Sequence, residues 1–145
     1  MKHIFILLVF IAALSAAVEK KISTNNEHVK LEMKLPEKIS LKSSGTLSFL
    51  FTPLEGIHIN TDPEFELLLE KQSVFEITGN PRYTKNKKGY LETKKPIEFT
   101  FKAKNGTMLG RQTLRGKLNY FYCSDKDGWC NRCTEQIEII VEVVR

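Results

Sequence analysis

The 145-residue sequence contains few of the residues that mark special scaffolds: eight glycines, five prolines and three cysteines. This low content excludes collagen-like and low-complexity chains. Hydrophobic residues make up 41% of the sequence and charged residues 27%, which excludes a disordered acidic tail. Residues 18–145 are expected to form one domain that is long enough to bury a core without cross-links, so the cysteines are free for another use.

Only one long hydrophobic run is present, and it lies at the start of the chain. Lys2 precedes the apolar stretch Ile4–Leu14, and Ser15 and Ala17 are placed as in a signal-peptidase cleavage site. The run is shorter than the roughly 20 residues that a transmembrane helix needs. Residues 1–17 are therefore predicted to be a secretory signal peptide cleaved near Ala17. We expect a periplasmic or secreted mature chain with no transmembrane segment.

Neither sign of charge dominates, because 22 Lys and Arg residues stand against 17 Asp and Glu residues, for a formal net charge of +5. A nucleic-acid-binding protein gathers its basic residues on one face, with aromatic residues among them. Here they alternate with Glu along most of the chain, and the basic cluster Lys85–Lys88 is expected to be a solvated loop. We expect no nucleic-acid partner.

Motifs of common enzymes are also missing. The sequence has no Ser-His-Asp set, no phosphate-binding glycine loop and no paired-carboxylate motif. These absences argue against a hydrolase or a nucleotide-dependent enzyme. No cofactor and no resident metal are expected.

Hydrophobic residues recur mainly with period two, which is typical of half-buried β-strands. The segments that show this pattern or are rich in strand-forming residues are Val29–Leu35, Leu47–Phe51, Ile57–Asn60, Val74–Thr78, Ile97–Phe101, Leu114–Cys123 and Ile137–Val143. A turn is expected at Gly79-Asn80-Pro81, and Glu64–Lys71 could be a short helix or a strand. About seven short strands without βαβ alternation predict an immunoglobulin-like antiparallel β-sandwich.

All three cysteines lie between the last two predicted strands, so we expect them at the tip of a hairpin. Side chains alternate across a sheet, which places Cys123 and Cys130 on the outer face and Cys133 on the inner face. Facing positions on antiparallel strands are close enough for a disulfide, whereas residues three apart on one strand are separated by about 10 Å. The pattern predicts a Cys123–Cys130 bridge, with both sulfurs on the surface side, and a free thiol at Cys133.

Other uses of these cysteines remain open from the residues alone. The bridge could be a structural staple in a non-enzymatic immunoglobulin-like binding module. Three thiolates plus His28 or His58 could form a zinc site. A thioredoxin fold is improbable, because the Cys130-Asn-Arg-Cys133 motif precedes a strand instead of opening a helix.

The cysteine segment resembles a known family. It runs Tyr120-Phe-Tyr-Cys123, then Gly128-Trp129-Cys130, then Thr134-Glu135, and Gly56-Ile-His-Ile-Asn60 lies upstream. These motifs are similar to those of the N-terminal periplasmic domain of the bacterial thiol:disulfide interchange protein DsbD. Asn60 stands where that family has an aromatic residue, and Cys133 stands near its usual proline.

The resemblance implies an immunoglobulin-like domain with a redox-active cysteine pair. Electrons would come from a separate membrane-bound donor and pass to thioredoxin-like or other exported proteins through a mixed disulfide. By the resemblance, Cys130 is the exchanging cysteine and Cys123 the resolving one. The residues expected to line the site are His58, Asn60, Tyr120, Trp129 and Cys133, with Tyr83 or Tyr90 as candidates for an aromatic cap.

Overall fold

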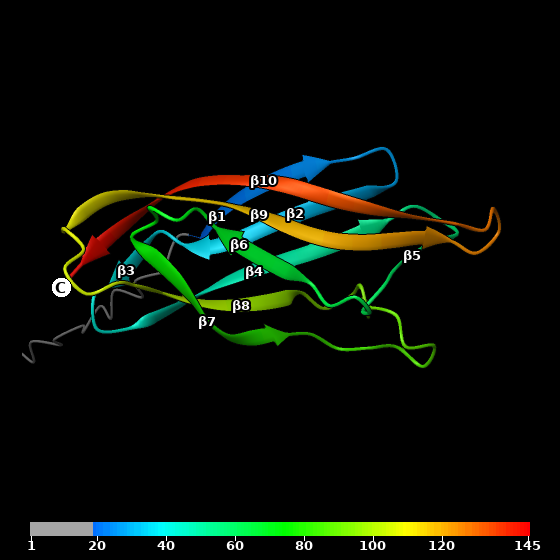
Figure 1. The fold of residues 1–145 in the computed structure, drawn as a ribbon, viewed down its shortest axis with the longest axis horizontal. Helices are drawn as coiled ribbons and strands as arrows, with labels where there is room; N and C mark the ends of the chain where they lie inside the picture. The colour runs from blue at the N-terminus through cyan, green and yellow to red at the C-terminus, as the bar shows by residue number, and fades with distance from the viewer. Residues whose placement is uncertain (1–18) are drawn as a thin grey trace, which may run out of the picture.

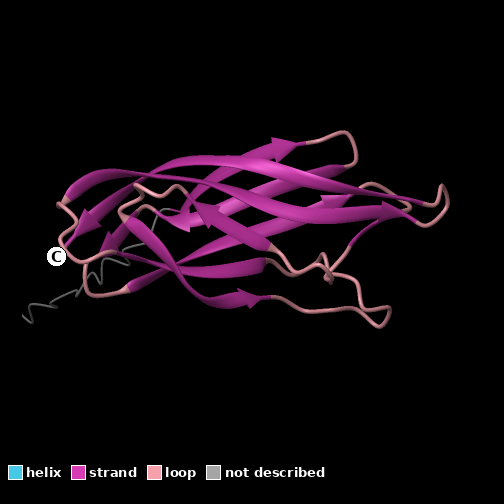
Figure 2. Ribbon diagram, in the orientation of Figure 1, coloured by secondary structure: helices cyan, strands magenta, loops and turns pink. Residues whose placement is uncertain are grey.

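The computed structural model describes residues 19–145, which form ten strands and no helix (Figures 1 and 2). The predicted signal peptide lies outside these residues. The strands are β1 Glu19–Asn25, β2 Val29–Pro36, β3 Lys38–Ser40, β4 Ser44–Pro53, β5 Ile57–Ile59, β6 Glu66–Leu69, β7 Phe75–Arg82, β8 Ile97–Ala103, β9 Gly110–Ser124 and β10 Trp129–Val144. The described part of the chain contains no helix that could cross a membrane.

The strands form two sheets packed face to face (Figure 1). The first sheet has the order β1-β2-β4-β8-β7, and the second has the order β3-β10-β9-β5, with β6 also paired to β9. Among the described strand pairs, β3 and β10 are parallel and the others are antiparallel. The architecture is the predicted immunoglobulin-like antiparallel β-sandwich.

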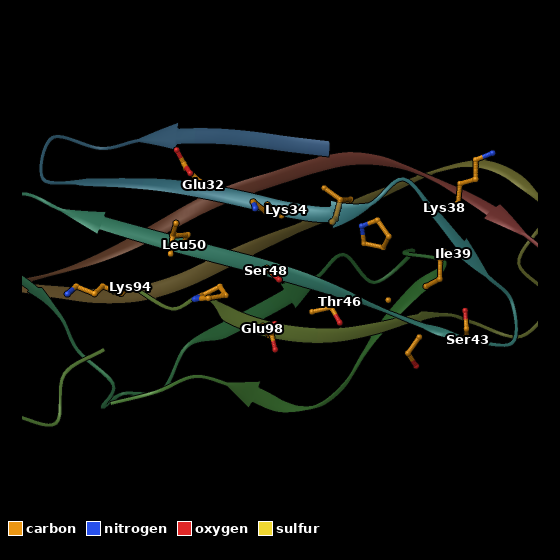
Figure 3. Close-up of a pocket in the computed structure, with 15 residues that line it drawn as sticks. Glu32, Lys34, Lys38, Ile39, Ser43, Thr46, Ser48, Leu50, Lys94 and Glu98 are labelled. Atoms are coloured by element: carbon orange, nitrogen blue, oxygen red, sulfur yellow. The ribbon is translucent and has the colours of Figure 1, made fainter. Parts of the chain in front are cut away.

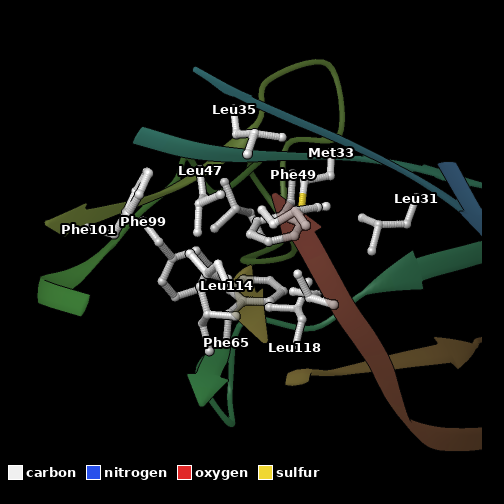
Figure 4. Packing of buried hydrophobic residues seen from close by; sticks show 14 of the residues in the cluster. Leu31, Met33, Leu35, Leu47, Phe49, Phe65, Phe99, Phe101, Leu114 and Leu118 are labelled. Carbon is white, nitrogen blue, oxygen red and sulfur yellow. The ribbon is translucent and has the colours of Figure 1, made fainter. Parts of the chain in front are cut away.

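The period-two pattern of the sequence places the hydrophobic residues between the sheets (Figure 4). In β4, Leu47, Phe49 and Phe51 are almost fully buried and alternate with more exposed residues. Leu114 and Leu118 of β9 face them from the second sheet and are also fully buried. The alternation that predicts the strands therefore also predicts which side of each strand faces the core.

The structure settles one open choice and corrects one local prediction. Glu64–Lys71 is not a helix, because Glu66–Leu69 pairs with β9, where Leu67 faces the core and Leu68 is exposed. Gly79-Asn80-Pro81 is not a turn between strands. It lies inside β7 at an irregularity in the pairing with β8, and the φ of 73° at Gly79 permits the distortion without a change of strand.

The segments that surround the cysteines lie together at one end of the sandwich (Figure 1). The tip of the β9–β10 hairpin lies there, together with β5 and the turn between β1 and β2. The C-terminus lies at the opposite end. The candidate site is therefore built by segments that are far apart in the sequence.

Candidate functional site

The two long strands β9 and β10 place Cys123 directly opposite Cys130. Their Cα atoms are 4.1 Å apart, and the two residues form a disulfide. Cys133 is a free, partly buried cysteine. The pairing of β9 with β10 runs without a shift from Trp129 to Val143, so the alternation of side chains holds along the hairpin. The predicted bridge and the predicted free thiol are both confirmed.

The hairpin loop is closed by its own hydrogen bonds. The backbone N–H of Gly128 donates to the carbonyl oxygen of Ser124 at 2.9 Å. The Ser124 hydroxyl donates to the Asp127 carboxylate at 2.9 Å and accepts from the Asp127 backbone N–H at 3.2 Å. The φ of 70° at Gly128 is one that L side chains rarely adopt. The turn is therefore held by its own hydrogen bonds in addition to the disulfide.

Both bridged cysteines lie on the outer face of the hairpin as predicted, but they are not equally exposed, which corrects the prediction that both sulfurs are at the surface. Cys123 is only 4% exposed, whereas Cys130 is exposed. Cys123 lies on β9, which has β10 on one side and His58 of β5 on the other. Cys130 lies where β10 has no second partner, because β3 pairs with β10 only near Val143. Alternation predicts the face of a residue but not how many strands flank it.

His58 joins three segments beside the bridge. Its ring stacks on Tyr90, with centroids 3.7 Å apart and planes 17° apart. Its Nδ1 lies 3.5 Å from Oδ2 of Asp125 in the hairpin loop. Tyr83, the other candidate for a cap, instead packs on Phe65 with ring centroids 5.1 Å apart. Tyr90 is therefore the aromatic residue that the structure brings to the cysteine pair, through His58.

Asn60 contacts the bridge directly. Its side-chain Nδ2 donates to the Cys123 sulfur at 3.1 Å. A disulfide sulfur carries no hydrogen and can only accept, so the amide nitrogen is the end that faces it. The backbone N–H of Asn60 donates to the carbonyl oxygen of Phe121 at 2.9 Å, which fixes the residue against β9.

Trp129 neighbours Cys130 in the sequence but points to the other face. Its ring packs against His28, with centroids 5.0 Å apart, and against Tyr122 at 5.8 Å. These contacts follow from the alternation of β10, in which Trp129 lies on the inner face. Trp129 therefore supports the hairpin from inside and does not cover the Cys130 sulfur.

Tyr120 and Cys133 form a second cluster on the inner face, where they are directly opposite each other. Asn26 Nδ2 donates to the Tyr120 hydroxyl oxygen at 2.8 Å and to the Cys133 sulfur at 3.4 Å. The Tyr120 hydroxyl donates to Glu135 at 3.4 Å. Burial, and then the neighbouring Cys133 and Glu135, raise the pKa of Tyr120 far above its usual value. The tyrosine hydroxyl is thus held in its neutral form.

The predicted site residues therefore divide into two groups. His58, Asn60, Cys123 and Cys130 come together on the outer face, whereas Tyr120, Trp129 and Cys133 lie on the inner face. Sequence reasoning did not identify Asn26, because no local pattern indicates that the β1–β2 turn reaches Tyr120. Within residues 19–145, no group of three or more His, Cys, Asp or Glu side chains is arranged to hold a metal ion.

A separate groove of about 680 Å³ opens on the first sheet (Figure 3). It is lined by residues of β2, β4 and β8 and by Lys38 and Ile39 of β3 in the second sheet, with polar side chains such as Ser48 and apolar ones such as Leu50. Sequence reasoning did not identify this groove. It shares no residue with the disulfide site, so the two are independent features of the surface.

Comparison with known proteins gives no match to a family model and no match to a curated protein. Among solved structures, the chain is similar to the GAE domain of GGA2p from Saccharomyces cerevisiae, with 14% identity and a TM-score of 0.47 over 86% of this chain and all of that one. It is also similar to the yeast GGA1 GAE domain, with 14% identity and a TM-score of 0.44 over 79% of this chain and 95% of that one. No functional statement about this chain follows from similarity at this level.

Proposed function

We propose that this protein is an exported thiol–disulfide exchange protein that works through the Cys123–Cys130 pair. The unequal exposure of the two cysteines carries this proposal. Exchange begins when a thiolate attacks a sulfur that it can reach, and it needs a second sulfur that can leave. Cys130 is exposed and can be reached by a partner thiolate, whereas Cys123 is 4% exposed and screened from attack, which leaves it as the departing sulfur. The resemblance of the cysteine segment to the DsbD family supports the same assignment.

A disulfide at this position is expected to add little to the stability of the hairpin. The two cysteines are only seven residues apart, so the bridge removes little chain entropy from the unfolded state. The loop between Ser124 and Gly128 already has its own hydrogen bonds. A staple at this position would add less than a bridge that joins distant parts of the chain. This favours exchange over the alternative of a binding module with a structural disulfide.

The proposed cycle transfers two electrons. The reduced protein attacks a disulfide of an exported partner through the Cys130 thiolate, which forms a mixed disulfide and releases one partner thiolate. The Cys123 thiolate then attacks the Cys130 sulfur, which closes the Cys123–Cys130 bridge and releases the second partner thiolate. The partner is reduced and this chain is oxidised. A membrane-bound dithiol donor returns the chain to its reduced form by the reverse steps.

A redox titration tests the proposal. The purified protein, residues 18–145, is equilibrated with glutathione buffers, and the thiols are trapped and mapped by mass spectrometry. A potential of roughly −180 to −270 mV for the Cys123–Cys130 pair falls in the range of exchange proteins and would support the proposal. A potential below about −300 mV is typical of structural disulfides and would support the binding module instead.

Trapping in cells tests the roles of the two cysteines. Cys123→Ala removes the resolving sulfur, so mixed disulfides with partners should accumulate on Cys130. The matched control is Cys130→Ala, which leaves only the buried sulfur of the pair and should trap nothing. Equal recovery of partners, or no recovery, from the two variants would contradict the proposed exchange.

A further inference from the structure

We propose that the Asn60 side chain stabilises the Cys123 sulfur as a thiolate when the bridge opens. The inference rests on the proposed function and assigns a specific role to one residue of its site. Asn60 Nδ2 lies 3.1 Å from the sulfur in the oxidised protein, so the donor is already in position before any exchange takes place. No movement of β5 is needed to bring it there.

The main chain that carries the amide is held in place by hydrogen bonds on both sides of it. The N–H of Asn60 donates to the carbonyl oxygen of Phe121, and the next residue, Thr61, donates its hydroxyl to the carbonyl oxygen of Gly89 at 2.7 Å. Thr61 is buried, with 7% of its surface exposed. These contacts fix both sides of the Asn60 residue. A donor fixed in this way avoids the cost of reorganisation when charge appears on the sulfur.

The charge appears on Cys123 because attack takes place at Cys130. In the step that opens the bridge, an incoming thiolate forms a bond to the exposed Cys130 sulfur while the Cys123–Cys130 bond breaks. The electron pair of that bond leaves with Cys123 as a thiolate. A hydrogen bond to an ionised acceptor is about twice as strong as one to a neutral acceptor. The Asn60 contact therefore favours the open state over the closed one.

Two carboxylates near the hairpin loop disfavour a thiolate on Cys123, and a neutral hydrogen-bond donor can offset part of this effect. Asp125 lies on the same side as His58 and would disfavour a second negative charge on Cys123. Asp127 is hydrogen-bonded to Ser124, at the end of the same strand. A fixed amide offsets part of this repulsion without adding a charge of its own.

The test compares the rate at which dithiothreitol opens the bridge in three variants and in the wild-type protein. Asn60→Asp keeps the size of the side chain but replaces the donor by a carboxylate. We expect its second-order rate constant to fall by about tenfold or more, as for the loss of a hydrogen bond to a charged group. Asn60→Ala should show a smaller fall, because it removes the donor without adding a charge. The control Asn131→Asp adds the same charge at an exposed position beside Cys130.

A second readout separates stabilisation of the thiolate from a general loss of structure. The pH dependence of Cys123 alkylation in the reduced protein, followed by mass spectrometry of the Cys123 peptide, gives the pKa of that thiol. Asn60→Ala should raise this pKa, whereas a general loss of structure would expose the buried Cys123 and lower its pKa toward that of a free thiol. If Asn60→Asp does not fold, Asn60→Ala decides the question alone.

The inference is overturned if Asn60→Ala matches the wild-type protein in both measurements and Asn60→Asp loses no more rate than Asn131→Asp. This failure is distinct from failure of the proposed function, because dithiothreitol cleavage needs no biological partner. A structural disulfide with a potential below about −300 mV could still show the Asn60 effect. Conversely, a protein that traps exchange partners could show no effect of Asn60 on the rate or on the pKa of Cys123.

Discussion

The ring of His58 lies face to face with the ring of Tyr90, with centroids 3.7 Å apart. Tyr90 belongs to an irregular segment between β7 and β8, which is held to β5 by the bond from the Leu91 backbone N–H to the carbonyl oxygen of Ile59. His58 is in turn the neighbour of Cys123 across the sheet. The stacked pair therefore lies beside the buried cysteine of the disulfide, with His58 next to Cys123 and Tyr90 on the ring of His58.

Tyr90→Ala should expose the Cys123 side of the bridge. We expect faster opening by dithiothreitol, because the buried sulfur becomes easier to solvate, and a loss of about 1 kcal/mol in the free energy of unfolding from the lost ring contact. The rate is measured by stopped mixing and the stability by urea unfolding. Tyr90→Phe is the matched control, since it keeps the ring and should behave as the wild-type protein. An unchanged rate in Tyr90→Ala would show that the stack does not shield the bridge.

Tyr120 should make the protein less stable at alkaline pH. Burial is the main cause that raises its pKa in the folded state, whereas tyrosine in the unfolded chain ionises near pH 10. Above that pH the unfolded state loses a proton that the folded state keeps, so the contribution of this group to stability falls by about 1.4 kcal/mol per pH unit. Below pH 10 the contribution is constant.

The comparison of wild type with Tyr120→Phe isolates this effect from the titration of other groups. The variant cannot ionise at this position, so the stability difference between the two proteins should shift in favour of the variant between about pH 10 and pH 12. At pH 7 the variant should be less stable by about 1–2 kcal/mol, because Asn26 loses an acceptor for its hydrogen bond. A pH-independent difference would contradict the assignment.

The hairpin explains why so much of the site could be predicted from the sequence. Period two fixes the face of every residue in a strand, and a short loop fixes which residues lie opposite each other. These two rules are sufficient to pair Cys123 with Cys130 and to direct Cys133 inward. They need only local information, and the β9–β10 pairing has no bulge to disturb it.

The surroundings of the pair could not be predicted in the same way. Burial of Cys123 depends on β5 lying on the far side of β9, and the hydrogen bonds of Tyr120 depend on Asn26, which is 94 residues away in the sequence. Such contacts follow from the order of strands in the sheets, which a hydrophobic pattern does not encode. The short strand β6 was ambiguous for the same reason, since its pairing with β9 overrides a weak helical periodicity.

Gly116→Ala should destabilise the protein, because β6 passes close to β9 at this residue. A Cβ on Gly116 would lie 2.5 Å from the carbonyl oxygen of Leu68, and that oxygen is backbone in a paired strand and cannot move freely. We expect a loss of about 1–3 kcal/mol in urea unfolding. Lys117→Ala, at an exposed neighbouring position, should change stability by less than about 0.5 kcal/mol. Equal stability of the two variants would mean that β6 lies farther from β9.

Cys133→Ser should leave the redox properties of the Cys123–Cys130 pair unchanged. Cys133 lies on the inner face opposite Tyr120, whereas the bridge lies on the outer face of the same hairpin, so the free thiol cannot approach either bridged sulfur without breaking the strand pairing. The glutathione equilibrium constant should be the same in the variant and in the wild-type protein, and peptide mapping of the wild type should find one disulfide only. A Cys133-containing disulfide in the native protein, or a shifted equilibrium in the variant, would show that the third cysteine takes part in exchange.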